Sequence, residues 1–228
     1  MSFSLTKQLL LLLLMLLFVW RVPAQSGTAL DYRLINGKIY AYYLPGNVSG
    51  NQFLSSPDFS EGTLWLSGKT YRNVLMNLDI LNQELLISFQ SPEGAKRIIS
   101  ASLAYIDSFY FEGKFFVVER DAGNRSRIYQ KIGRGGLCFY FQWTKSLDLR
   151  SSLNSIRYEF SNAGREIFLQ RKGKRIALSN NRKLYKLFPK EQAAQLRKFM
   201  RSHKWKINKM QDCDYPSLLE FLYSLDRA

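Results

Sequence analysis

The chain offers few side chains of the kinds that carry out catalysis. It has one histidine, His203, and two cysteines, Cys138 and Cys213. Acid–base and nucleophilic enzymes ordinarily use a histidine, paired carboxylates or an activated serine or cysteine. His203 continues the apolar side of a predicted helix, which favours a core or boundary position over a catalytic one. One histidine and two distant cysteines cannot form an ordinary zinc site, so we predict no metal site and no cofactor.

The cysteines have different surroundings in the sequence. Cys138 lies in the strand-like run Leu137–Trp143, and Cys213 lies between Asp212 and Asp214. The flanking carboxylates disfavour a thiolate, which argues against a reactive nucleophile at Cys213. An oxidising compartment would permit a disulfide between Cys138 and Cys213. The sequence leaves that pairing and two separate free thiols both open.

Carboxylates alone can catalyse hydrolysis, as in glycosidases, because the required pairing is spatial. Five acids lie near the ends of predicted strands: Asp79, Glu84, Asp107, Glu112 and Glu119. Exposed acids are expected at such places, so the pattern does not single out a catalytic pair. The run Gly133–Gly136 is a turn and not a phosphate loop, because no Gly-Lys-Ser/Thr follows it. Because a carboxylate pair can form in space without a sequence motif, the alternative function is an envelope hydrolase that acts on glycan or lipid with such a pair.

The positive charge of the chain is concentrated in one stretch. The formal net charge is +15, and fourteen lysines and arginines lie between Arg171 and Lys209 against one acid, Glu191. We call Arg171–Lys209 the basic stretch. The solvated surfaces of soluble proteins usually mix both signs. This polarity predicts either a surface that faces an anionic partner or a solvated helix face that aids solubility.

The candidate binding residues lie within the basic stretch and are Lys190, Arg197, Arg201, Lys204, Trp205 and Lys206. Their partner would be an anionic membrane surface, a polysaccharide or an acidic protein. Trp205 could anchor at a membrane interface or stack on a base. A tryptophan among basic neighbours more often packs its ring on the domain while the neighbouring charges extend outward.

Short apolar runs separated by glycine turns fill residues 30–178. Turn signals every eight to twelve residues predict an antiparallel sheet body, as a meander, sandwich or open barrel. The run Leu137–Trp143 alternates with period two, which is typical of a strand. Gly46–Ser60 is rich in glycine, asparagine, serine and proline, and it predicts a surface loop.

After Leu178 the periodicity becomes helical. Ser179–Asn181 is expected to cap a helix over Arg182–Phe188, and a second helix is predicted over Lys190–Ser202. A third is predicted to begin at Asp214 or Ser217. The predicted fold class is therefore α+β, with two or three short C-terminal helices. Helices this short must pack on the sheet or on each other, so we assign 25–178 to the sheet domain and 179–228 to a basic helical segment packed on it.

The N-terminus reads as a signal peptide over residues 1–24. Lys7 precedes an unbroken apolar run, Leu9–Trp20, which is too short to span a bilayer comfortably. Val22 and Ala24 supply small residues at the −3 and −1 positions for cleavage before Gln25. The sequence therefore predicts export to the periplasm, the outer membrane or the medium.

Two parts of the chain show a likeness to a known group. They are Gly68–Asp79 followed by Glu84–Ser88, and Gly173–Ser179 followed by Leu184–Pro189, the lysine-rich helix and Leu218–Leu225. Together they resemble small uncharacterised exported β-rich proteins of Bacteroidota with a Leu-Phe-Pro helical tail. The resemblance implies a compartment and a fold, and it implies no mechanism.

Charge and compartment together predict a function by binding. We expect a non-enzymatic exported cell-envelope protein that binds an anionic envelope component or a protein partner through its basic C-terminal helices. Nucleic acid is disfavoured as a partner by export. The sequence makes no prediction of the oligomeric state.

Overall fold

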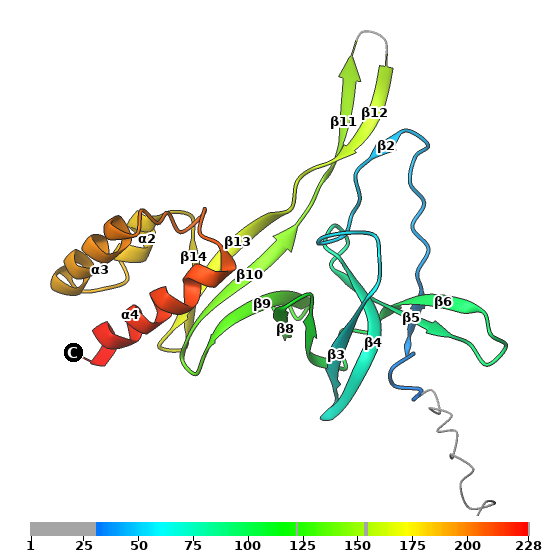
Figure 1. The fold of residues 1–228 in the computed structure, drawn as a ribbon, viewed down its shortest axis with the longest axis horizontal. Coiled ribbons are helices and arrows are strands. Elements are labelled where there is room, and N and C mark those ends of the chain that lie inside the picture. The colour runs from blue at the N-terminus through cyan, green and yellow to red at the C-terminus, as the bar shows by residue number, and fades with distance from the viewer. Residues whose placement is uncertain (1–30, 122, 153–154, 228) are drawn as a thin grey trace, which may run out of the picture. The chain divides into compact units, whose positions relative to one another are not determined.

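The apolar runs and glycine turns form strands in the computed structural model, which describes residues 31–121, 123–152 and 155–227 (Figure 1). The strands are β1 (Gly37–Ile39), β2 (Val48–Ser49), β3 (Ser60–Leu66), β4 (Lys69–Asp79), β5 (Glu84–Gln90), β6 (Lys96–Ala101), β7 (Ile106–Phe111), β8 (Lys114–Arg120), β9 (Ser126–Arg134), β10 (Leu137–Thr144), β11 (Leu147–Ser152), β12 (Ser155–Phe160), β13 (Gly164–Arg171) and β14 (Lys174–Leu178). The predicted signal peptide and the cleavage site before Gln25 lie outside the described residues.

Eleven of these strands form one antiparallel sheet. Its order is β1-β6-β5-β4-β3-β7-β8-β9-β10-β13-β14. Most neighbours are consecutive in the chain, so the sheet is a meander that ends in the edge strands β1 and β14. The strands β11, β12 and β2 form a second sheet, in which β12 pairs β2 in parallel. The predicted α+β class with an antiparallel sheet body is confirmed.

Three of the two-residue turns between neighbouring strands of the large sheet share one backbone conformation. In each of Ser67-Gly68, Glu112-Gly113 and Lys172-Gly173, both residues have a positive φ. That backbone is the type I′ turn, whose twist matches that of the flanking strands. Glycine at the second position adopts it without a steric penalty, which explains why glycine turns in the sequence located these hairpins correctly.

The C-terminal segment forms α2 (Asn181–Tyr185), α3 (Lys190–Ser202), the short 3₁₀ helix η1 (Asp212–Asp214) and α4 (Tyr215–Arg227). Asn180 caps α2 by accepting a hydrogen bond from the backbone N–H of Lys183 at 3.0 Å. The helix ends at Tyr185, earlier than the predicted Phe188, because tighter turns carry the chain to Pro189. No helix among the described residues is long and apolar enough to cross a membrane.

The helices bury an apolar face of the sheet. Side chains of β10 and β13, including Phe139, Phe141 and Leu169, form one cluster with residues of α3 and α4 such as Leu196 and Leu222. All five of these side chains have no exposed surface. A separate cluster lies on strands β3 to β9 and does not include the helices. The helical segment is thus part of a core that it shares with the sheet.

A polar network ties the start of η1 to the sheet. The Asp212 carboxylate accepts hydrogen bonds from the side-chain amide of Gln130 at 2.8 Å and from Arg165 at 2.5 Å. Trp143 donates its indole N–H to the Gln130 side-chain carbonyl at 2.7 Å. The Arg165 guanidinium also lies 4.8 Å from the centre of the Phe141 ring. Three strands therefore hold the segment that leads into α4.

The predicted surface loop Gly46–Ser60 is partly wrong. It contains β2, and Gln52, Phe53 and Leu54 within it are buried. The backbone explains the burial, because Leu54 N–H donates to Leu78 O at 3.0 Å and Ile80 N–H donates to Gln52 O at 3.1 Å. These bonds pair Gln52–Leu54 with the C-terminal end of β4, beyond Ser60, where the pairing of β3 with β4 begins.

Candidate anion-binding surface

Helix α3 divides into a buried and a basic side. Ala193, Leu196 and Met200 face the core, whereas Arg197 and Arg201 are exposed. Residues four apart lie on one side of an α-helix. The two arginines therefore form a row on the solvent side of the helix, as the spacing predicts.

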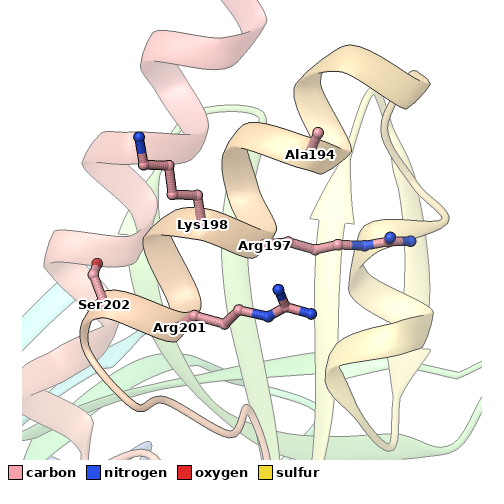
Figure 2. A pocket seen from close by; sticks show the side chains of 5 residues that line it. All are labelled: Ala194, Arg197, Lys198, Arg201 and Ser202. Carbon is pink, nitrogen blue, oxygen red and sulfur yellow. The ribbon is translucent and has the colours of Figure 1, made fainter.

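The row borders an open depression of about 550 Å³. Its lining residues are Ala194, Arg197, Lys198, Arg201 and Ser202. Figure 2 shows Arg197 and Arg201 projecting from the same side of α3, with Lys198 directed to the other side. The short side chain of Ala194 leaves space beside Arg197. Two guanidinium groups are thus presented next to each other at a shallow, accessible surface.

Acids do not neutralise this row. Within residues 31–121, 123–152 and 155–227, no ion pair of the structure includes Arg197, Lys198 or Arg201. The Arg197 guanidinium lies 5.4 Å from the centre of the Tyr185 ring. A guanidinium over an aromatic face keeps its donors available on the solvent side. The charges of the row are therefore available to a ligand.

Two arginines at the start of the basic stretch have structural partners. Arg171 binds the Asp226 carboxylate at 2.5 Å and lies over the Phe188 ring at 4.2 Å. Arg175 binds Glu119 at 2.5 Å and lies 3.8 Å from the centre of the Tyr140 ring. Both ion pairs fasten distant segments of the chain to each other. The basic stretch therefore divides into packed arginines at its start and an open row on α3.

The remaining candidates lie at or near the two ends of α3. Lys190 is its first residue, and Lys204 and Lys206 follow its last turn; all three are exposed. Lys190 is seven positions before Arg197, a spacing that returns to the same helix side. We define the basic surface as the six exposed residues Lys190, Arg197, Lys198, Arg201, Lys204 and Lys206. Lys198 was absent from the sequence prediction, which followed one helix side only.

Trp205 belongs to an aromatic stack and not to the open row. Its ring lies 4.5 Å from His203 and 5.7 Å from Phe199, measured between ring centres. Its backbone carbonyl accepts a hydrogen bond from the side-chain amide of Asn181 at 2.8 Å. The half-buried indole therefore joins the end of α3 to α2. We expected a core or boundary position for His203. The residue follows the last turn of α3 with its side chain exposed and stacked on Trp205, so it lies at the boundary and not in the core.

The five acids near strand ends all have structural partners. Asp79 is fully buried, contrary to the expectation of exposed acids, and caps the β4–β5 turn by accepting from the backbone N–H groups of Leu81 and Asn82. Its other oxygen accepts from the Tyr40 hydroxyl at 2.8 Å. Burial above all raises the pKa of Tyr40. Of the remaining acids, Glu84 pairs with Lys38 and Glu119 pairs with Arg175. Asp107 accepts a hydrogen bond from the Gly68 N–H, and Glu112 accepts one from the Ser55 hydroxyl.

Both cysteines are free thiols. Cys138 is buried and Cys213 is exposed, so the structure contains no bridge between them. Burial is the main cause that raises the pKa of the Cys138 thiol. In the part of the chain that the structure describes, no three histidine, cysteine or acidic side chains are grouped as metal ligands.

No family model, curated protein or solved structure matches this chain. The likeness to exported proteins of Bacteroidota therefore stays a prediction. The function has to be argued from the basic surface and from the partners of each charged group.

Proposed function

We propose that the protein is a non-enzymatic, exported cell-envelope protein that binds an anionic partner through the basic surface. The observation that carries the proposal is the exposed pair Arg197 and Arg201, which lies beside an open depression. Among the residues that the structure describes, no acid forms an ion pair with either of them. By contrast, Arg171 and Arg175 at the start of the basic stretch are each paired closely with an acid. Within the basic stretch, the open row therefore differs from these two packed arginines, whose charges are neutralised by acids.

The chemistry of the row suits phosphate or carboxylate groups displayed on a surface. Arginine presents planar, fixed donors that bind such groups in pairs. The depression is too open to enclose a small molecule, and it suits a head group that belongs to a larger surface. An exported protein meets lipid phosphates and acidic polysaccharides in the envelope, which supports this class of partner.

The proposal is tested with phosphatidylcholine vesicles that contain or lack phosphatidylglycerol. The variant Lys190→Gln/Arg197→Gln/Arg201→Gln/Lys204→Gln removes four charges from the basic surface. A basic side chain near an anionic membrane contributes about 1 kcal/mol, so the loss of four should weaken binding by about two to three orders of magnitude. Added salt should weaken the binding of the unaltered protein in the same assay, because salt screens these charges.

A matched control removes four charges elsewhere. Arg72, Arg97, Arg120 and Arg134 are exposed and lie on β4, β6, β8 and β9. Their replacement by glutamine lowers the net charge equally and should have a much smaller effect on vesicle binding. Equal effects of the two variants would show that net charge alone attracts the vesicles. Absence of binding to the anionic vesicles and to lipopolysaccharide would refute an anionic envelope partner.

A further inference from the structure

The β11–β12 hairpin has one apolar and one charged face. Leu149 lies opposite Tyr158 on the apolar face, and Ile156 follows on the same face opposite Ser151. The exposed fractions of Leu149 and Ile156 are 57% and 62%. In Figure 1 the hairpin extends away from the large sheet, with β2 at its base. Apolar side chains of a projecting hairpin that stay this exposed indicate a contact surface.

On the charged face of the hairpin, like charges oppose each other. Asp148 lies opposite Glu159, and Arg150 lies opposite Arg157. Like charges directly across an antiparallel pair destabilise it. The diagonal contact of Arg150 with Glu159 at 3.4 Å and its contact along the strand with Asp148 at 4.0 Å partly offset this repulsion. The hairpin is electrically neutral, yet each of these four charged residues lies directly opposite one of the same sign.

The outer edge of β11 has backbone groups available for another strand. β11 is the terminal strand of the small sheet. Tyr158 N–H donates to Asn47 O on the β2 side, and Ser161 N–H donates to Ser146 O on the β11 side. Backbone groups alternate direction along a strand, so Asp148 and Arg150 face β12. The N–H and C=O of Leu149 therefore point outward.

We propose that a second copy of this chain pairs with β11, antiparallel and centred on Leu149. In that register Leu149 lies opposite the Leu149 of the second copy, as a hydrogen-bonded pair on a twofold axis. Asp148 then lies opposite the second copy's Arg150, and Arg150 opposite its Asp148. The pairing joins two small sheets into one and doubles the width of the apolar face around Leu149.

Charge complementarity selects a second copy over other occupants. The order Asp-Leu-Arg is self-complementary in an antiparallel pair, because reversing it about the central leucine exchanges acid and base. A lipid surface would not complement this alternation of charge. Strand addition at a free edge also satisfies the outward backbone groups of Leu149, which gives affinity along with specificity. The inference is independent of the basic surface, because no residue of that surface is used.

Charge reversal tests the pairing. Sedimentation of the mature protein, from nanomolar to about 100 μM, should show a monomer–dimer equilibrium with a constant in the micromolar range. Asp148→Arg replaces two cross-copy attractions by repulsions and should weaken the dimer by about tenfold to a hundredfold. The same change places the new arginine opposite Glu159, so the hairpin itself should remain folded.

Exchange of the two charges supplies the rescue. Asp148→Arg/Arg150→Asp restores the self-complementary order with the signs reversed, and the dimer should return. In a Cys213→Ser background, Leu149→Cys should form an intermolecular disulfide under mild oxidation. Ile156→Cys, equally exposed on the other strand of the hairpin, should do so much less. A monomer across the whole range, a dimer that Asp148→Arg does not weaken, or an exchange variant that stays monomeric would overturn the proposal.

Discussion

Leu219 on α4 lies so close to β9 that a side chain at position 133 would have to displace it. A Cβ atom on Gly133 would lie 2.8 Å from the Cδ1 atom of Leu219 and 3.0 Å from the Leu137 carbonyl oxygen. The φ of Gly133 is +110°, a backbone conformation that side chains rarely adopt. Backbone and packing therefore require glycine at the same place, where α4 contacts the sheet.

We predict that Gly133→Ala destabilises the protein by more than a glycine substitution at an open turn. Gly113 has a φ of +74° and no atom within 4 Å of its would-be Cβ, so Gly113→Ala measures backbone strain alone. That strain costs about 1–2 kcal/mol. Gly133→Ala adds the clash with Leu219 and should cost about 1–3 kcal/mol more. Urea unfolding of both variants measures the difference in their free energies of unfolding. Equal losses would show that Leu219 and α4 move aside without a cost in stability.

Leu222 tests whether the helical segment is part of the core. Its side chain is fully buried in the cluster shared by α4, β10 and β13. Leu222→Ala should lower the free energy of unfolding by about 2–5 kcal/mol, the usual range for a buried leucine. Truncation after Asn180 removes the cover of Phe139 and Phe141 and should abolish cooperative unfolding. A truncated protein that melts as sharply and at the same temperature would make the segment an independent appendage.

Local sequence signals predicted the elements whose geometry is decided locally. The turns Ser67-Gly68 and Lys172-Gly173 were predictable because a positive φ selects glycine. The sequences of β6 and β11 do not read as apolar runs, because lysine, arginine or aspartate interrupts their apolar pattern. Phe53 is buried because its neighbours Gln52 and Leu54 form backbone hydrogen bonds with the end of β4 and the residue after it. Such bonds join segments far apart in the sequence, so a local sequence pattern does not predict them.

The network around Asp212 makes a second test of how the tail is held. Gln130 and Asp212 are 82 positions apart and meet at 2.8 Å. A double-mutant cycle with Gln130→Ala and Asp212→Ala should give a coupling energy of about 0.5–3 kcal/mol. The pair Lys114 and Asp212 is longer, at 3.7 Å, and should couple more weakly. Additive effects of the first pair would mean that Arg165 and Lys114, and not Gln130, hold Asp212.

The candidate site was predictable in part, because helical periodicity is also a local signal in the sequence. Helical periodicity placed Arg197 and Arg201 on one side of α3, and the structure agrees. It could not show that Arg171 and Arg175 are neutralised, because their acids lie 55 and 56 positions away. Nor could it show the stack of His203 on Trp205, which forms where α3 ends and the chain turns back.

Tyr215 gives the fold a dependence on alkaline pH. Its side chain is fully buried between Phe139 and Phe141, and its hydroxyl donates to the Ile207 carbonyl at 2.7 Å. Burial, opposed by the charge of Arg165, raises the pKa of Tyr215 to about 12. The unfolded chain loses this proton near pH 10, whereas the folded chain keeps it to about pH 12. The stabilisation is therefore present below pH 10 and lost between pH 10 and 12.

The loss should amount to roughly 3 kcal/mol across that window, because each pKa unit corresponds to about 1.4 kcal/mol. Tyr215→Phe removes the titrating group and should cost about 1 kcal/mol at pH 8, through the lost hydrogen bond to Ile207. Since the variant lacks this alkaline loss, its stability curve should cross that of the unaltered protein between pH 10 and 12. Tyr43→Phe is the control, because Tyr43 is 91% exposed and should leave the curve unchanged. Urea unfolding at pH 8, 10, 11 and 12 gives the free energy of unfolding of both variants as a function of pH. Parallel curves for Tyr215→Phe and the unaltered protein would show that the Tyr215 hydroxyl reaches solvent in the folded state.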